Sequence, residues 1–505
     1  MKKFISYILI AMILTISATP MIIMAEPAVT SSTKPTASDT TSEKPSDTPS
    51  STPKTEETAK PSSSPEGEKK DEDKKKDEDK KTSEENKTDE SGRPILPERE
   101  TAILIEATTG AVLYEDGSDD KMFPASTTKI MTALVALESI KRGEHTVEEK
   151  ITVTKEMLAG LPGDGSNMNL KEEEEISIKE LLEGLLIPSG NDAAMALAFT
   201  IGGSPEHFVE MMNERANKLG LKGTHFMNPH GLHNEEHYTT ARDMSKIAME
   251  AMKLDTFRGV VEIAHIKIPP TNKNPQRYYI NTNGLLSTMR YREYYYPKST
   301  GIKTGHTKEA GNCLVASAMN DNFELISVVF NGASVKNSHK DTIRLLDYGF
   351  TNFKTVVAVP KGKMMGEVKV KQGAKGVDHV TLSTSDEMKI VVPNDAKKED
   401  IKTNLVIPEK AYAPIELGKV LANASISYKG TELAKVELIA DTEVEQEPLG
   451  FIMAFGETLW ASKIVRIITY VLGLLLIFFI FVGIVRLNRE IKRAKRYKKA
   501  KKTVR

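Results

Sequence analysis

Cysteine is nearly absent from this chain of 505 residues, in which Cys313 stands alone. One thiol cannot form a disulfide within the chain, and it excludes a metal site built from several cysteines. Aromatic residues are also scarce, at 6% of the total, whereas charged residues make up 28%. We attribute both values to a long polar segment that dilutes a globular part of ordinary composition. The length is sufficient for two or three domains.

An excess of charge of one sign is lacking too, since the formal net charge is −1. The charges are instead segregated along the chain. Residues 26–97 consist of Ser, Thr, Pro, Lys, Glu and Asp with almost no apolar side chains. Such a segment cannot bury enough surface to offset its chain entropy, so we expect a disordered linker. Acids and lysines balance in residues 68–81, which argues against a nucleic-acid-binding arm.

Residues 1–25 have the pattern of a secretory signal peptide. Lys2 and Lys3 precede the apolar run Phe4–Ile16, and small residues follow up to Ala25. Ile23 fits the cleavage pattern poorly, so retention of this segment as an N-terminal anchor is the alternative.

Residues 98–354 carry the signals of one mixed domain. Ala102–Glu106 and Ala111–Glu115 are apolar strands around a glycine-containing turn, which predicts a hairpin. Helices lie between strand patterns at both ends, so the sequence favours a layered α/β or α+β domain. The predicted later elements are helices over 178–187, 193–199, 205–219 and 341–353, a loop over 224–243, and strands over 311–318 and 323–330.

A change of composition after Thr355 marks a second domain. Short β-type runs at regular spacing predict an all-β domain over residues 355–447, without a concentrated set of catalytic residue types. A spacer or binding role is therefore expected. The runs are Val356–Val359, Met365–Lys371, Val377–Leu382, Met388–Val392, Thr403–Ile407, Ala424–Lys429 and Glu432–Leu438.

Near the C-terminus, Ile467–Val485 contains no charged residue and is long enough to cross a bilayer, which predicts a transmembrane helix over 466–486. The following tail, 487–505, is rich in Lys and Arg with Glu490 as its only acid. Positive charge holds such a tail in the cytoplasm, so the folded domains are expected outside the cell membrane. The alternative is a buried helix followed by a basic tail that binds nucleic acid.

Ser126 and Lys129 form an S-x-x-K motif within FPASTTKIMTAL. Their spacing places both on one face of a helix that is expected to begin near Ser126, after Pro124. A helix N-terminus favours developing negative charge, and a serine beside a lysine is the arrangement of an activated nucleophile. The same spacing recurs at Ser51 in the linker, so the motif alone is not specific. The residues expected to face a core are Ile130, Leu134 and Leu137.

Two further motifs follow in the same domain. Ser189-Gly190-Asn191 lies at the break between two predicted helices, where Ser189 can relay a proton and Asn191 can donate to and accept from an amide. Lys303-Thr304-Gly305 is expected on a strand. There Lys303 supplies positive charge for a carboxylate and helps keep Lys129 neutral, Thr304 adds a hydroxyl, and Gly305 allows close approach of the backbone.

In this order, S-x-x-K, S-x-N and K-T-G resemble the motifs of the penicillin-recognising serine enzymes. The flanks FPASTTKIMTAL, IPSGNDAAMALA and GIKTGHTKEAGNCLVASA narrow the resemblance to the D-alanyl-D-alanine carboxypeptidases, the low-molecular-weight penicillin-binding proteins. It covers residues 95–353 strongly and the β domain more weakly. The resemblance implies an α/β (α+β) penicillin-binding/β-lactamase-like transpeptidase fold, with an antiparallel sheet flanked by helices.

The resemblance also implies a mechanism. Ser126 would attack the carbonyl between the terminal D-alanines of a peptidoglycan stem pentapeptide, while neutral Lys129 accepts its proton. The backbone N–H groups of Ser126 and His306 would form the oxyanion hole. The implied partners are peptidoglycan, β-lactam antibiotics and the bacterial membrane, without nucleic acid, metal or cofactor. The implied site residues are Ser126, Lys129, Ser189 and Asn191 for catalysis and Lys303, Thr304, Gly305 and His306 for substrate binding.

Several residues allow two interpretations. His230 and His237 could bind a metal, but their loop lacks matching ligand spacing, which favours structural or cleft-lining roles. Arg242 either anchors the fold around it or contacts substrate. Cys313 fits a buried strand position better than a reactive thiol. The tyrosines that either rim the cleft or simply pack are Tyr291 and Tyr294–Tyr296.

The sequence departs from the family pattern in two places. Family members often carry an arginine in the stretch that is Asn331–Lys340 here, where it helps to hold the substrate carboxylate. This chain has none there, and Lys336, His339 and Lys340 are the candidate substitutes. The usual amphipathic C-terminal anchor is replaced by a full span.

Two other functions stay open at this point. A class A β-lactamase would carry Asp where this chain has Gly190, together with a deacylating Glu, for which we find no equivalent loop. A wall-binding protein with a degenerate site would keep the fold without acylation.

Overall fold

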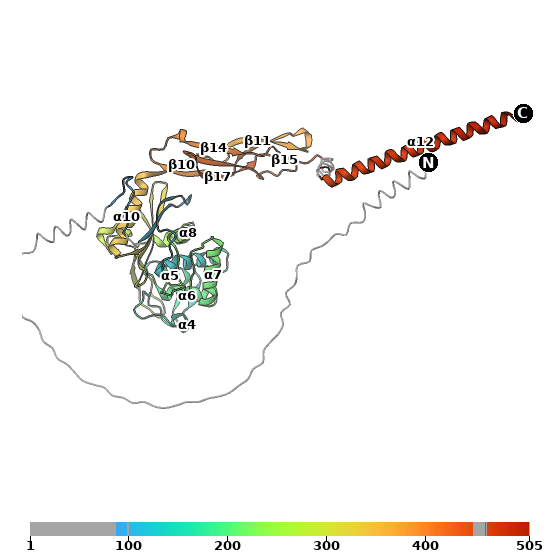
Figure 1. Cartoon of the computed structure of the whole chain (residues 1–505). Helices are drawn as coiled ribbons and strands as arrows, with labels where there is room; N and C mark the ends of the chain where they lie inside the picture. Colours follow the sequence, from blue (N-terminus) through green and yellow to red (C-terminus); the bar gives the residue numbers. More distant parts are fainter. Residues whose placement is uncertain (1–86, 98–99, 448–459, 461, 504–505) are drawn as a thin grey trace, which may run out of the picture. The chain divides into compact units, whose positions relative to one another are not determined.

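The computed structural model describes residues 87–97, 100–447, 460 and 462–503. The predicted signal peptide and most of the predicted linker lie outside these residues. At the centre of the first folded region, which is coloured from blue to yellow in Figure 1, is a five-stranded antiparallel sheet. Its strand order is β2-β1-β9-β8-β7. Its strands are β1 (Thr101–Glu106), β2 (Val112–Asp116), β7 (Ser299–Thr307), β8 (Gly311–Asn320) and β9 (Phe323–Gly332).

Within this sheet, a strand from the start of the domain pairs with a strand from near its end. β1 runs antiparallel to β9, from Thr101 opposite Phe330 to Glu106 opposite Leu325. Helices α3 to α9 belong to a long insertion between β2 and β7, whereas α10 follows β9. The predicted hairpin over 102–115 and the predicted antiparallel sheet flanked by helices are confirmed.

Each face of the sheet carries its own core. Along β1, Ile103 and Ile105 belong to one buried cluster, and Ala102 and Leu104 to another. This alternation is the two-residue period of a strand. The first cluster includes side chains of α3 (Lys129–Lys141), α5 (Ile178–Leu186), α6 (Asn191–Gly202), α7 (Pro205–Lys218), α8 (Ala241–Met252) and α9 (Asp255–Val261), whereas α10 (Val335–Asn352) contributes to the second.

Helix α3 is buried on every side along most of its length. The predicted core residues Ile130, Leu134 and Leu137 are buried, but so are the residues between them. The sequence pattern predicted one apolar face, whereas α3 contacts the sheet-covering helices around it. The turn that carries Ser126 precedes α3 as the short 3-10 helix η1 (Ala125–Thr128).

Two predicted boundaries differ from the structure. The last helix of the domain was expected to begin at Asp341, but α10 begins at Val335, where the Ser334 side chain accepts a hydrogen bond from the N–H of Asn337. The first turn of α10 is mostly polar, so a search for apolar periodicity does not detect where the helix begins. Similarly, α8 begins inside the predicted loop, because the Thr240 side chain caps it by accepting from the N–H of Asp243.

The region from Phe353 to Ala440 is built from β-strands, as predicted. Strands β10 (Phe353–Val359) and β13 (Met388–Pro393) pair with each other, and a six-stranded sheet has the order β14-β16-β17-β12-β11-β15. Each predicted run overlaps a strand, while the three-residue β15 (Lys410–Tyr412) was missed. The other strands are β11 (Met364–Lys371), β12 (His379–Thr384), β14 (Ile401–Val406), β16 (Val420–Tyr428) and β17 (Thr431–Ala440).

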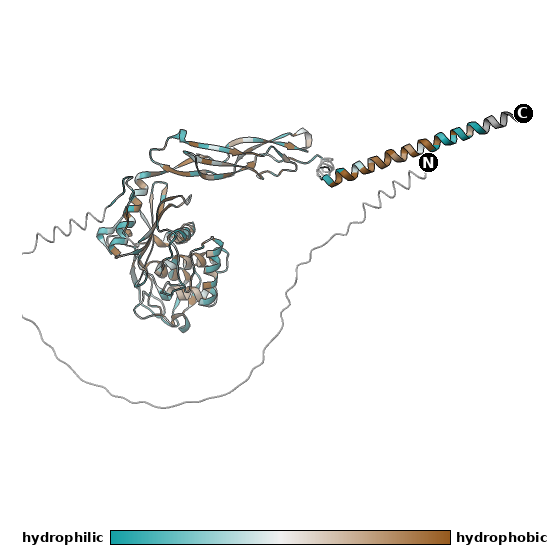
Figure 2. Ribbon diagram, in the orientation of Figure 1, coloured by the Kyte–Doolittle hydropathy of each residue, from teal (hydrophilic) through white to brown (hydrophobic). Residues whose placement is uncertain are grey.

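A single long helix, α12 (Lys463–Thr503), contains the predicted span. Within the part of the chain that the structure describes, it is the one helix long and apolar enough to cross a membrane, over Lys463–Arg496. Figure 2 shows apolar residues along its first part and hydrophilic residues towards its C-terminal end. The basic segment thus continues the same helix.

Ordered contacts begin before residue 97, where the linker was expected to end. The guanidinium of Arg344 in α10 donates to the carbonyl oxygens of Lys87 and Ile95, at 2.7 and 3.2 Å. Leu96 is buried in the core on the α10 face of the sheet. An isolated apolar residue beside a polar segment is too weak a pattern to reveal such packing.

A buried ion pair holds the segment that precedes α5. Glu174 is fully buried, and its carboxylate accepts from Arg277, Asn274 and Thr271 at 2.6, 2.6 and 2.9 Å. Arg277 lies on β6 (Arg277–Ile280), which pairs with β5 (His265–Ile268). Arg277 also donates to the carbonyl of Met168 at 3.2 Å. This network fixes residues 168–174 against the β5–β6 hairpin.

We expect Arg277→Met to lower the free energy of unfolding by about 3–5 kcal/mol, because the Glu174 charge would stay buried without its partner. Chemical denaturation followed by circular dichroism measures this loss. The control is Arg142→Gln, which breaks a half-exposed pair with Glu144 and should leave the unfolding midpoint nearly unchanged. Equal effects of the two substitutions would contradict the structural role given to Arg277.

Candidate active site

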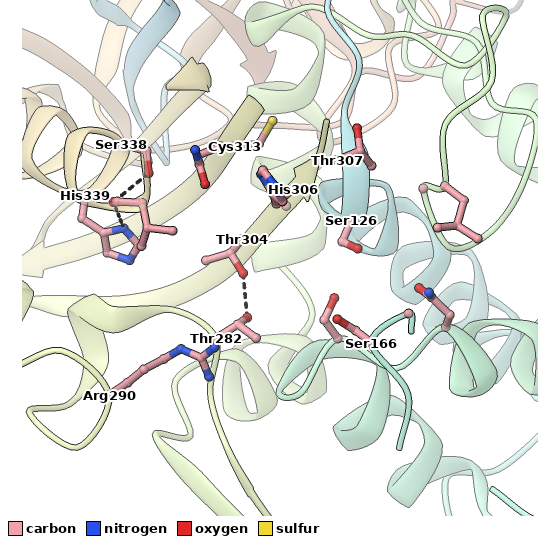
Figure 3. Close-up of a pocket in the computed structure, with 18 of the residues that line it drawn as sticks. Ser126, Ser166, Thr282, Arg290, Thr304, His306, Thr307, Cys313, Ser338 and His339 are labelled. Carbon is pink, nitrogen blue, oxygen red and sulfur yellow. Dashed lines mark hydrogen bonds between the residues drawn. The ribbon is translucent and has the colours of Figure 1, made fainter. Parts of the chain in front are cut away.

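Ser126 and Lys129 meet as their spacing predicted. The Nζ atom of Lys129 lies 2.9 Å from the Oγ atom of Ser126. Ser126 lies on η1 and lines a cleft of about 370 Å³, whereas Lys129, on the first turn of α3, is fully buried beneath it. Figure 3 shows the Ser126 side chain directed into this cleft.

The amine of Lys129 has two further partners. It donates to Oδ1 of Asn191 and to the carbonyl oxygen of His230, each at 2.7 Å. Both oxygens can only accept hydrogen bonds. A neutral amine has two N–H groups and one lone pair. With both N–H groups directed at these oxygens, the lone pair faces the hydroxyl of Ser126.

Electrostatics favour the neutral form of Lys129. Burial lowers the pKa of this amine well below its usual value, and the nearby charge of Lys303 lowers the pKa further. Asp192 acts in the opposite direction but more weakly. The carboxylate of Asp192 is already held by the N–H groups of Met168 and Leu170, at 2.8 and 3.0 Å. Lys129 can therefore accept a proton.

The break between α5 and α6 brings Ser189 and Asn191 to the same cleft. Ser189 is buried and has a positive φ of 70°, a conformation that is costly for a residue with a side chain. Asn191 is the first residue of α6, and its N–H donates to the carbonyl of Ser166 at 2.8 Å. The predicted break thus presents both side chains to the cleft that Ser126 lines.

Strand β7 forms another wall of the cleft. Thr304, Gly305 and His306 line it, whereas Lys303 is fully buried and donates to the carbonyl of Thr304 at 2.9 Å. Burial, and then the charge of Arg290, lower the pKa of Lys303 to about 7. A Cβ atom on Gly305 would lie 3.0 Å from the backbone nitrogen of Ser126. Glycine therefore lets β7 approach the nucleophile.

The sequence did not predict which residues hold the η1 turn that carries Ser126. His237 Nε2 lies 2.8 Å from Oγ1 of Thr128, and that hydroxyl donates to the carbonyl of Ala125 at 2.8 Å. Gly231 has a φ of 86°, and a Cβ there would lie 1.9 Å from the Ala125 carbonyl oxygen. The segment Asn228–Leu232, with the sequence NPHGL, could have signalled this close approach through its glycine.

The two loop histidines have structural contacts. Burial lowers the pKa values of His230 and His237 to about 3, so both rings are neutral. His237 Nδ1 accepts from the N–H of Met227 at 3.0 Å, and His230 Nδ1 from that of Leu232 at 3.2 Å. Among the described residues, no cluster of three His, Cys, Asp or Glu side chains could hold a metal.

For the other residues that allowed two interpretations, the structure shows which positions line the cleft and which do not. Arg242 pairs with Glu115 and with Asp119, the latter at 2.7 Å, and it anchors the fold away from the cleft. Cys313 is a buried strand residue whose thiol pKa burial raises to about 12. Of the tyrosines, Tyr291 lines the cleft, Tyr294 and Tyr296 are buried, and Tyr295 is exposed.

Two protein families match this chain. The family described as D-alanyl-D-alanine carboxypeptidase matches residues 91–334, and that described as penicillin-binding protein 5, C-terminal domain, matches residues 353–446. D-alanyl-D-alanine carboxypeptidase DacF of Bacillus subtilis is 35% identical over 365 residues, covering 72% of this chain and 89% of that protein. DacA of Escherichia coli is 32% identical over 365 residues, covering 69% and 84%.

A solved structure agrees with these relatives. Penicillin binding protein 5 from Haemophilus influenzae is similar with a TM-score of 0.61 at 31% identity, and the match covers 70% of this chain and 100% of that one. All three motifs lie within the first matched range, and the two ranges together leave only α10 of the two folded regions uncovered. The chain therefore belongs to the D-alanyl-D-alanine carboxypeptidase family of low-molecular-weight penicillin-binding proteins.

Proposed function

We propose that this protein is a serine carboxypeptidase that removes the terminal D-alanine from peptidoglycan stem pentapeptides through an acyl-enzyme on Ser126. The observation that carries the proposal is the buried amine of Lys129, held 2.9 Å from the Ser126 hydroxyl by two oxygens that can only accept. A serine needs such a base beside it to act as a nucleophile at neutral pH. Trimming stem peptides in this way would remodel the cell wall.

Acylation follows from these contacts. Ser126 Oγ attacks the carbonyl between the two D-alanines while its proton passes to Lys129. The negative charge that develops on the carbonyl oxygen would be bound by the N–H groups of Ser126 and His306. The close approach that Gly305 permits between β7 and η1 supports this pairing. An oxyanion donor of this kind is worth roughly 3–4 kcal/mol.

Release of D-alanine requires a proton on its nitrogen. Ser189 lines the cleft beside Asn191, so we assign it the relay between Lys129 and the leaving amine. Asn191 would contact the substrate amide with its side-chain nitrogen, because its oxygen is engaged by Lys129. Lys129 would then activate the water that hydrolyses the acyl-enzyme. β-lactams would enter as mimics of the dipeptide and leave a persistent ester.

The protein would act at the outer face of the cell membrane. We place the signal peptide at 1–25, the linker at 26–97, the catalytic domain at 98–354 and the β domain at 355–447. We assign the membrane span to 466–486 and the cytoplasmic tail to 487–505. The apolar first part of α12 and the lysines and arginines that follow it support this orientation (Figure 2).

Removal of the nucleophile is the first test. Fluorescent penicillin should label the full-length protein in detergent, and Ser126→Ala should abolish the label without changing the circular dichroism spectrum. A label that persists on the variant, or a folded wild type that never labels, would contradict the proposal. Rapid penicillin turnover without D-alanine release from a pentapeptide would favour a β-lactamase instead.

The pH dependence should report on the two lysines. As pH falls, Lys129 gains a proton and ceases to act as a base. As pH rises through about 7, Lys303 loses the positive charge that attracts the substrate carboxylate. We therefore expect kcat/KM for D-alanine release to decline on this alkaline side. Lys303→Arg, whose side chain stays protonated, should move the decline to higher pH; an unmoved limb would contradict the role of Lys303.

The orientation of the protein in the membrane can be measured by labelling cysteines introduced one at a time. The native Cys313 should not react with the label, because it is buried and burial raises the pKa of its thiol. In intact cells, a membrane-impermeant maleimide should label Lys361→Cys in the β domain but not Lys495→Cys in α12. Both positions are exposed. Lys495→Cys should react only after permeabilisation. Labelling of Lys495→Cys in intact cells would overturn the proposed orientation.

A further inference from the structure

The cleft contains a cation that none of the motifs includes. Arg290 is the only lysine or arginine among the described residues that line it, since Lys129 and Lys303 are buried beneath the surface. A substrate that ends in D-alanine brings a carboxylate into this space. Burial also leaves Lys303 only partly charged near neutral pH, and its amine already donates to the Thr304 carbonyl.

The candidate substitutes in 331–340 do not supply this charge. Lys336 and Lys340 are absent from the residues that line the cleft. His339 lines it, but its Nε2 accepts from the N–H of Gly284 at 3.1 Å while Nδ1 lies 2.8 Å from the carbonyl of Val335. That pattern requires a proton on Nδ1 and none on Nε2, so the ring is neutral.

Arg290 is well placed to bind an anion. Figure 3 shows its side chain extending towards Thr282 and Thr304, whose hydroxyls are 2.7 Å apart. Asp164 is the one acid that lines the cleft, yet the structure gives no ion pair between it and Arg290 within the described part of the chain. The contact found for the guanidinium is with the ring of Tyr291, 5.7 Å from its centroid. Its fork of N–H groups is therefore available to a ligand.

The segment that carries Arg290 is anchored on both sides. Tyr294 is buried with its ring 5.2 Å from that of His339, and the Tyr296 hydroxyl donates to Asp347 of α10 at 2.8 Å. Before it, the N–H of Gly284 is held by His339. The loop between these anchors thus starts and ends on fixed contacts, which limits where Arg290 can reach.

We propose that Arg290 binds the terminal carboxylate of the substrate, together with the Thr304 hydroxyl, and so makes the enzyme select chains with a free C-terminus. A guanidinium matches a carboxylate with two parallel hydrogen bonds, which a lysine cannot reproduce. Burial first, and the nearby charge of Arg290 after it, lower the pKa values of Lys303 and His339, in keeping with a guanidinium close to this end of the cleft. The inference rests on the proposed acylation of Ser126.

The test varies the charge on both the protein and the ligand. Acylation rate constants are measured by mass spectrometry on the full-length protein in detergent, with benzylpenicillin and with its methyl ester, which lacks the carboxylate. For Arg290→Gln we expect a loss of about 10- to 100-fold with benzylpenicillin. The rate with the ester should stay near the wild-type value. Arg290→Lys should recover part of the loss.

The matched control is Arg292→Gln, which removes a neighbouring exposed arginine that does not line the cleft and should behave as the wild type. Equal losses with both ligands, or no loss with either, would overturn the role of Arg290 while leaving acylation intact. A wild type that is acylated by neither ligand would instead overturn the proposed function itself.

Discussion

An amine with no access to water determines how this site works. Lys129 is fully buried, and the solvation that would stabilise its charge is missing. Its two acceptor-only partners take up both N–H groups of the neutral form. What remains is a lone pair facing Ser126. In the mechanism that we propose, desolvation and hydrogen-bond geometry together activate the Ser126 hydroxyl.

The elements around Lys129 keep its amine buried and supply its hydrogen-bond acceptors. A lysine can be buried at the start of α3 because that helix is enclosed by the helices around it. The acceptors come from distant segments, Asn191 from the start of α6 and His230 from the loop before α8. Gly231 and Gly305 then allow two backbones to approach the Ser126 turn more closely than any side chain would permit. The proposed catalysis and the packing of the domain therefore depend on the same contacts.

Local patterns allowed much of this to be predicted from the sequence. Three features depend only on neighbours in the chain: the spacing of Ser126 and Lys129, the helix break at Ser189, and the strand that carries Lys303. Periodicity also predicted a layered α/β domain and the β domain, whereas the penicillin-binding fold was predicted from the resemblance of the three motifs. Long-range pairs could not be predicted, because a local pattern does not show which distant residue a side chain will contact. His237 contacts Thr128, which is 109 residues away in the sequence, and Arg277 pairs with Glu174, which is 103 residues away. Arg290 was missed for the same reason, since it lies in a loop just before Tyr291 and no local pattern links that loop to the cleft.

Whether Lys129 is neutral can be measured directly. In protein labelled with carbon-13 at the lysine ε-carbons, the NMR signal of Lys129 is the one that disappears in Lys129→Arg. Followed against pH in the folded enzyme, this signal should titrate well below the 10.5 that is usual for the side chain. A Lys129 signal that titrates at about 10, like an exposed lysine, would contradict the account.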